Sequence, residues 1–130
     1  MGNIRKKEGC VVGSGITVDG FIDGMVAGLA VSGVKAVNSD QLDRRLVDAF
    51  HMLEDEAGDE CELRFHLEMN PLTNSCHTAK IAVDRAVKRG VLSRQKDRLE
   101  VVIDSKDAKH VFRRLPLNET TWVRLANKVG

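Results

Sequence analysis

The sequence predicts an α+β protein that is mainly helical and carries a small antiparallel β-hairpin. Three observations lead to this class. Apolar residues recur at helical spacing behind the capping residues Ser39 and Asn118. Two strand-like runs, 91–94 and 99–103, flank the polar turn 95–97. The chain has 130 residues, of which 42% are hydrophobic, and this fits a soluble globular protein of one domain's length.

Residues 1–37 form a glycine-rich, apolar N-terminal segment. Part of it has apolar side chains at helical spacing, namely Phe21, Met25, Val26 and Leu29. Each glycine weakens an isolated helix by about 1 kcal/mol, so a helix here needs other elements packed around it. A small-residue series indicates either close helix packing, for instance in a dimer, or a flexible loop: Gly20, Gly24 and Gly28.

The clearest helix spans residues 39–57. Ser39 can cap it, Asp40 and Asp43 suit the positive end of its dipole, and Gly58 ends it. One apolar stripe runs along this helix and consists of Leu42, Leu46, Ala49, Phe50 and Leu53. We expect this stripe to face the core.

Residues 60–69 allow two interpretations. Apolar and polar side chains alternate along them, which is typical of a half-buried strand. Leu63 and Leu67 are four residues apart, which also allows a short helix. Pro71 ends either element.

Three further helices follow from local signals. Asn74 or Ser75 is expected to cap a helix that runs to about Arg89, with Gly90 at its C-terminal end.

Ser105 or Asp107 is expected to cap the next helix, which reaches Leu115 before Pro116 breaks it. Asn118 caps a last short helix over residues 119–128.

The charges are unevenly distributed along the chain, although the formal net charge is only +1. Residues 39–70 hold three basic and ten acidic side chains, whereas residues 77–114 hold eleven basic and five acidic side chains. Such asymmetry indicates an anionic partner for the basic half, or else pairing between the two halves.

The basic half also contains a motif. A capped helix is followed by the exit sequence Lys88-Arg89-Gly90-Val91-Leu92 and then by the hairpin segment SRQKDRLEVVID. This pattern resembles the recognition helix and wing of winged helix-turn-helix regulators, and the hairpin segment is similar to the wing of MarR-type repressors. The partial match covers residues 39–103, with 39–57 as the first helix and 60–69 as the second. The resemblance implies a small DNA-binding protein that regulates transcription.

A helix that enters the major groove needs small, polar or basic side chains near its N-terminal end, where free amides can also contact a phosphate. We expect the helix from residue 75 to provide these contacts and the hairpin to reach the backbone or minor groove. A solvated surface face is the alternative for the same residues. The candidate DNA-binding residues are Ser75, His77, Thr78, Lys80, Arg85, Lys88, Arg94, Lys96 and Arg98.

The expected organisation is an N-terminal packing or dimerisation segment, 1–37, followed by a winged-helix-like domain with C-terminal helices, 38–130. One such module buries little surface for tight, specific binding, so we expect a homodimer on double-stranded DNA. No run of 18 apolar residues is present, so neither a membrane span nor a secretion signal is predicted. The odd number of cysteines argues against a disulfide framework, and a cytoplasmic location is expected.

The sequence predicts no catalytic residue, no metal site and no cofactor. The cysteines and histidines lack the spaced pairs of a zinc site, and Gly13 and Gly15 lack the third glycine of a dinucleotide-binding loop. The alternative function is a non-catalytic protein-interaction or adaptor module of α+β type, with the acidic helix 40–56 as its contact face. A strand at 60–69 in a sheet of its own would favour that alternative.

Overall fold

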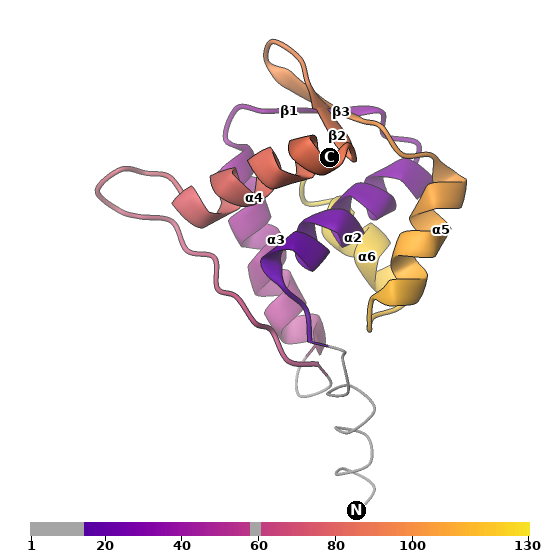
Figure 1. Cartoon of the computed structure of the whole chain (residues 1–130). Helices are drawn as coiled ribbons and strands as arrows, with labels where there is room; N and C mark the ends of the chain where they lie inside the picture. Colours follow the sequence, from indigo (N-terminus) through magenta and orange to yellow (C-terminus); the bar gives the residue numbers. More distant parts are fainter. Residues whose placement is uncertain (1–14, 58–60) are drawn as a thin grey trace, which may run out of the picture.

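Five helices and a three-stranded antiparallel sheet make up the part of the chain that the structure, a computed structural model, describes, namely residues 15–57 and 61–130 (Figure 1). The α+β class is therefore confirmed. The element order is α2 (Val18–Val31), β1 (Ala36–Asn38), α3 (Leu42–Ala57), α4 (His77–Arg89), β2 (Leu92–Arg94), β3 (Arg98–Val101), α5 (Ser105–Arg114) and α6 (Glu119–Ala126).

Helix α2 lies at the centre of the fold and packs against α4, α5 and α6. Thr17 caps it by accepting a hydrogen bond from the Gly20 amide. A Cβ atom at Gly24 would lie 2.5 Å from the Trp122 ring, and one at Gly28 would lie 2.6 Å from the Trp122 carbonyl oxygen. These two glycines therefore allow α6 to approach α2 closely. The small-residue series serves helix packing within the chain, and the packing offsets the low helix propensity of glycine.

The sheet has the strand order β1-β3-β2. Strands β2 and β3 form the predicted hairpin, with Leu92 opposite Val101 and Arg94 opposite Leu99. Strand β1 was not predicted; it pairs with the other edge of β3 and places Val37 opposite Leu99. Both of these side chains are buried, so the inner face of the sheet joins the core.

Residues 61–69 are extended, and their side chains alternate between buried or half-buried and exposed. The alternating pattern therefore predicts the alternating burial correctly, and the interpretation of this segment as a helix is wrong. The segment is part of none of the described strands. Among the described residues, Ile16 pairs with it, donating to the Glu62 carbonyl at 2.8 Å and accepting from the Arg64 amide at 2.9 Å. Gly58 and Glu60, the expected ends of the neighbouring elements, lie outside the described residues.

The remaining helix boundaries follow from local caps, with two exceptions. Helix α3 begins at Leu42, three residues after the expected cap Ser39. Asn118 caps α6 as expected, and Gly90 ends α4 with a left-handed φ of 85°. Asp104 caps α5 in a capping box, one residue before the expected Ser105. Neither Asn74 nor Ser75 caps α4, because this helix starts after Cys76, whose side chain makes no capping hydrogen bond.

Candidate nucleic-acid interface

Helix α4 has one face in the core and the opposite face in water. Its buried face consists of small and apolar side chains, namely Ala79, Ala82, Val83 and Ala86. The exposed side chains of His77, Ile81, Asp84 and Lys88 follow at spacings of three and four residues, so they form one stripe along the outer face. The helix is therefore a ridge on the surface, and Figure 1 shows it beside the projecting β2–β3 hairpin.

Four of the candidate cations form no ion pair within the described part of the chain. They are exposed, and two lie on α4 while two lie in the hairpin: Lys80, Lys88, Lys96 and Arg98. Their charges are available to an anionic partner.

Two other candidate cations are already paired. Arg94 Nη2 lies 2.5 Å from Asp84 Oδ1, and Arg85 Nη1 lies 3.7 Å from Asp19 Oδ1. The paired side chains are 41–62% exposed, and exposed ion pairs contribute about 0–1 kcal/mol each. Each pair can therefore exchange its carboxylate for a phosphate at small cost.

The ion pairs of the described residues lie within each charged segment or reach other parts of the chain. Within residues 15–57 and 61–130, no ion pair joins the acidic segment 39–70 to the basic segment 77–114. The partners of Arg85 and Arg89 lie on α2 instead, and Arg94 pairs within the basic segment. The charge asymmetry had two explanations, and one of them was pairing between the two halves. The described residues show no such ion pair.

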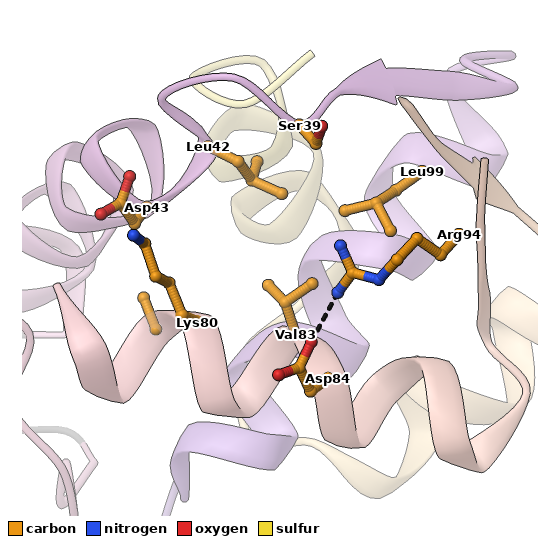
Figure 2. A pocket seen from close by; sticks show the side chains of 9 residues that line it. Ser39, Leu42, Asp43, Lys80, Val83, Asp84, Arg94 and Leu99 are labelled. Carbon is orange, nitrogen blue, oxygen red and sulfur yellow. Dashed lines mark hydrogen bonds and ion pairs between the residues drawn. The ribbon is translucent and has the colours of Figure 1, made fainter. Parts of the chain in front are cut away.

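A hollow of about 320 Å³ separates α4 from β2, β3 and the N-terminal end of α3 (Figure 2). Leu42, Val83 and Leu99 provide its apolar lining. Figure 2 shows Arg94 reaching across to Asp84, while the Lys80 side chain extends toward Asp43. Basic and acidic groups therefore alternate around this hollow, and it is not a purely cationic groove.

A second hollow, of about 510 Å³, lies between α4 and the segment that precedes it. It brings together three of the candidate residues, Ser75, His77 and Thr78, with His66. Glu68 is the one carboxylate among the described residues that line it. The hollow thus offers hydroxyl and imidazole groups, which can donate hydrogen bonds without carrying a fixed charge. Sequence reasoning found the α4 residues but not the hollow, because the hollow depends on the path of residues 66–75.

The N-terminal end of α4 is held by Asp43, which lies in the first turn of α3 as expected from the sequence. Asp43 Oδ2, on α3, accepts a hydrogen bond of 2.8 Å from the Cys76 amide. The acceptor therefore comes from 33 residues away, which no local pattern indicates. The expectation that this end of the helix is open to a phosphate is wrong for the Cys76 amide, because a carboxylate already occupies it.

Within the described ranges, no helix combines the length and apolarity needed to cross a bilayer, and no group of three His, Cys, Asp or Glu side chains is placed to hold a metal ion. The Gly13–Gly15 loop begins outside these ranges. Comparisons with protein-family models, with curated proteins and with solved structures found no match to this chain.

Proposed function

We propose that this chain is a DNA-binding protein of the winged helix-turn-helix type, with α4 as its recognition helix and the β2–β3 hairpin as its wing, and that it regulates transcription by occupying DNA. The observation that carries the proposal is the ridge formed by α4. This ridge has an exposed outer face, one hollow along its side and another at its N-terminal end, and next to it a hairpin with two cations that form no ion pair in the described part of the chain. A protruding helix of this kind fits the major groove, which is about 12 Å wide.

The order of the elements supports the proposal. A winged helix-turn-helix has two helices before the recognition helix and a hairpin after it, and here α2 and α3 precede α4 while β2 and β3 follow. The assignment differs from the one expected from sequence, where residues 39–57 served as the first helix. With α2 as the first helix and α3 as the second, residues 61–69 need no helix. The long connection from α3 to α4 then replaces the tight turn.

The charge supports it as well. The six candidate cations on α4 and the hairpin are Lys80, Arg85, Lys88, Arg94, Lys96 and Arg98. If all six met phosphates, the logarithm of the association constant would fall with the logarithm of salt concentration with a slope of about −5. Binding as a homodimer would add a second set of contacts, and this part of the proposal rests on the small surface of one module.

The alternative, a protein-interaction module, would be favoured by a strand at 60–69 in a sheet of its own. Over residues 61–69 the chain is extended but forms no sheet of its own. The exposed acidic side chains of α3 include Asp48, Glu54 and Asp55, and they remain the contact face that this alternative would use.

The test is a fluorescence-anisotropy titration of a pool of random-sequence duplexes at about 50 mM and about 200 mM salt. The wild-type chain should bind at micromolar concentration or tighter at the lower salt. The triple variant Lys88→Ala, Lys96→Ala and Arg98→Ala removes three unpaired cations, so the salt slope should become less steep by about 3.

The matched control removes the same charge from α5, in the triple variant Lys106→Ala, Arg113→Ala and Arg114→Ala. These side chains are also exposed and form no ion pair in the described part of the chain. The control should keep most of the wild-type slope. Equal losses in the two triple variants would show non-specific attraction to charge rather than a site, and absence of salt-sensitive wild-type binding would overturn the proposed function.

A further inference from the structure

Leu72 is the most exposed large apolar side chain among the described residues, with 93% of its surface in water. The next are Val102 at 54% and Ile81 at 38%. A single exposed leucine is common on protein surfaces and is not by itself a sign of function. The turn that carries Leu72 makes this one unusual.

The turn is rigid. The Asn70 side-chain oxygen accepts from the Leu72 amide at 2.8 Å, and the Asn70 backbone pairs with Ser75 and Asn74 at 2.7 Å each. Arg44 on α3 donates to the Asn74 side chain at 2.6 Å and ties the turn to the body. These bonds fix the path of the turn and keep the Leu72 side chain in water, so DNA would meet a surface that is already formed.

The turn lies at the N-terminal end of α4, on the side away from the hairpin. Figure 1 shows it projecting from the body there, while the hairpin projects near the C-terminal end of the same helix. Helix α4 has 13 residues and is therefore about 20 Å long. The two projections thus flank the helix that we assign to the major groove.

The hollow of about 510 Å³ lies between this turn and α4, and Asn70 and Thr73 of the turn belong to its lining. In duplex DNA, a phosphate backbone separates a major groove from the next minor groove. A backbone that passed over the hollow would meet the donors Ser75, His77 and Thr78 on the α4 side and Glu68 on the opposite side, and the minor groove beyond it would face the tip of the turn. Residues 71–76 carry no charge, so the tip is suited to base edges rather than to phosphates.

We propose that the Pro71–Leu72 tip enters the minor groove beside the major groove that receives α4, and that the Leu72 side chain wedges between two base pairs and kinks the duplex. This inference rests on the proposed DNA-binding function. Minor-groove proteins insert leucine and proline side chains between base steps in this way and partly unstack them. Flexible TA steps would take the wedge most readily.

The test uses short duplexes of alternating T and A that carry 2-aminopurine, whose fluorescence rises when its base unstacks. Wild-type protein should bind them and raise the fluorescence. Leu72→Ala should abolish most of the rise and weaken binding about tenfold, because it removes the burial of one leucine. The salt slope should stay unchanged, since no phosphate contact is lost. Leu72→Ile should keep the rise, because an apolar wedge remains.

The matched control is Val102→Ala, which shortens another exposed apolar side chain and should behave as wild type. If Leu72→Ala binds with wild-type affinity and fluorescence, the wedge is overturned, DNA binding stands, and an apolar pocket on a partner protein becomes the occupant of the tip. If wild-type protein binds no duplex at either salt concentration, the proposed function and this inference fall together.

Discussion

Replacing Asp43 tests how helix α4 is held in place. Its carboxylate is the acceptor for the Cys76 amide at 2.8 Å, and α4 has neither a side-chain cap of its own nor an acidic residue in its first turn. Loss of an N-terminal capping acceptor costs about 0.5–2 kcal/mol, and loss of a negative charge at a helix N-terminus costs about 0.3–1 kcal/mol. Asp43→Ala should therefore lower the free energy of unfolding by about 1–3 kcal/mol.

The assay is urea denaturation of Asp43→Ala, Asp43→Asn and the control Asp48→Ala. Asparagine keeps an acceptor and loses only the charge, so its loss should be about 0.3–1 kcal/mol. Asp48 is an exposed acid on the same helix with no hydrogen bond or ion pair in the described part of the chain, so its replacement should change stability by less than about 0.5 kcal/mol. If Asp43→Ala unfolds with the same midpoint as Asp48→Ala, the reasoning about this cap is refuted.

The same variants separate stability from DNA binding. Asp43 lines the hollow beside Lys80 and Arg94, where its charge would repel a phosphate. Asp43→Asn should therefore bind random-sequence duplex more tightly than wild type while being less stable. Weaker binding by this variant would contradict the proposal that DNA approaches this side of α4.

Two glycine replacements test the packing and the end of α4. Gly28→Ala should destabilise the fold by about 2 kcal/mol in urea denaturation, because its Cβ would lie 2.6 Å from the Trp122 carbonyl oxygen and 2.9 Å from the Ala126 Cβ. Gly20→Ala places a Cβ with no contact under 3.4 Å, so it should stabilise the fold by up to about 1 kcal/mol. Gly90→Ala should lower the free energy of unfolding by about 1–2 kcal/mol. The cause is the φ of 85° alone, since the added Cβ would meet no atom of the surrounding structure within 4 Å. An unchanged unfolding midpoint would contradict this prediction.

The elements that sequence predicted well are those whose signals are local. Asn118 accepts from the Thr121 amide three residues away, and Gly90 adopts the left-handed conformation that ends α4. The hairpin turn lies between two short strands whose inward side chains include Leu92 and Leu99. In each case the residues that decide the structure are neighbours in the chain, so pattern and propensity are sufficient.

The features that sequence could not predict depend on contacts between distant segments. The α4 cap comes from Asp43, and Arg89 on α4 pairs with Asp23 on α2, 66 residues away. The central position of α2 depends on Trp122 filling the space over Gly24. Of the nine candidate site residues, sequence identified side chains that are exposed or half-buried, but not which of them are paired, because Arg85 and Arg94 owe their partners to the tertiary fold.

The small net charge of +1 is compatible with a DNA-binding surface because part of the acidic charge lies away from the hairpin cations. In Figure 1, α3 runs away from the hairpin, and the exposed acids Glu54 and Asp55 belong to the C-terminal part of this helix. A molecule with such opposed ends orients in the field of a polyanion, with its cationic end leading. The acidic segment then disfavours approach by the wrong face, and it does not cancel the cations on the hairpin.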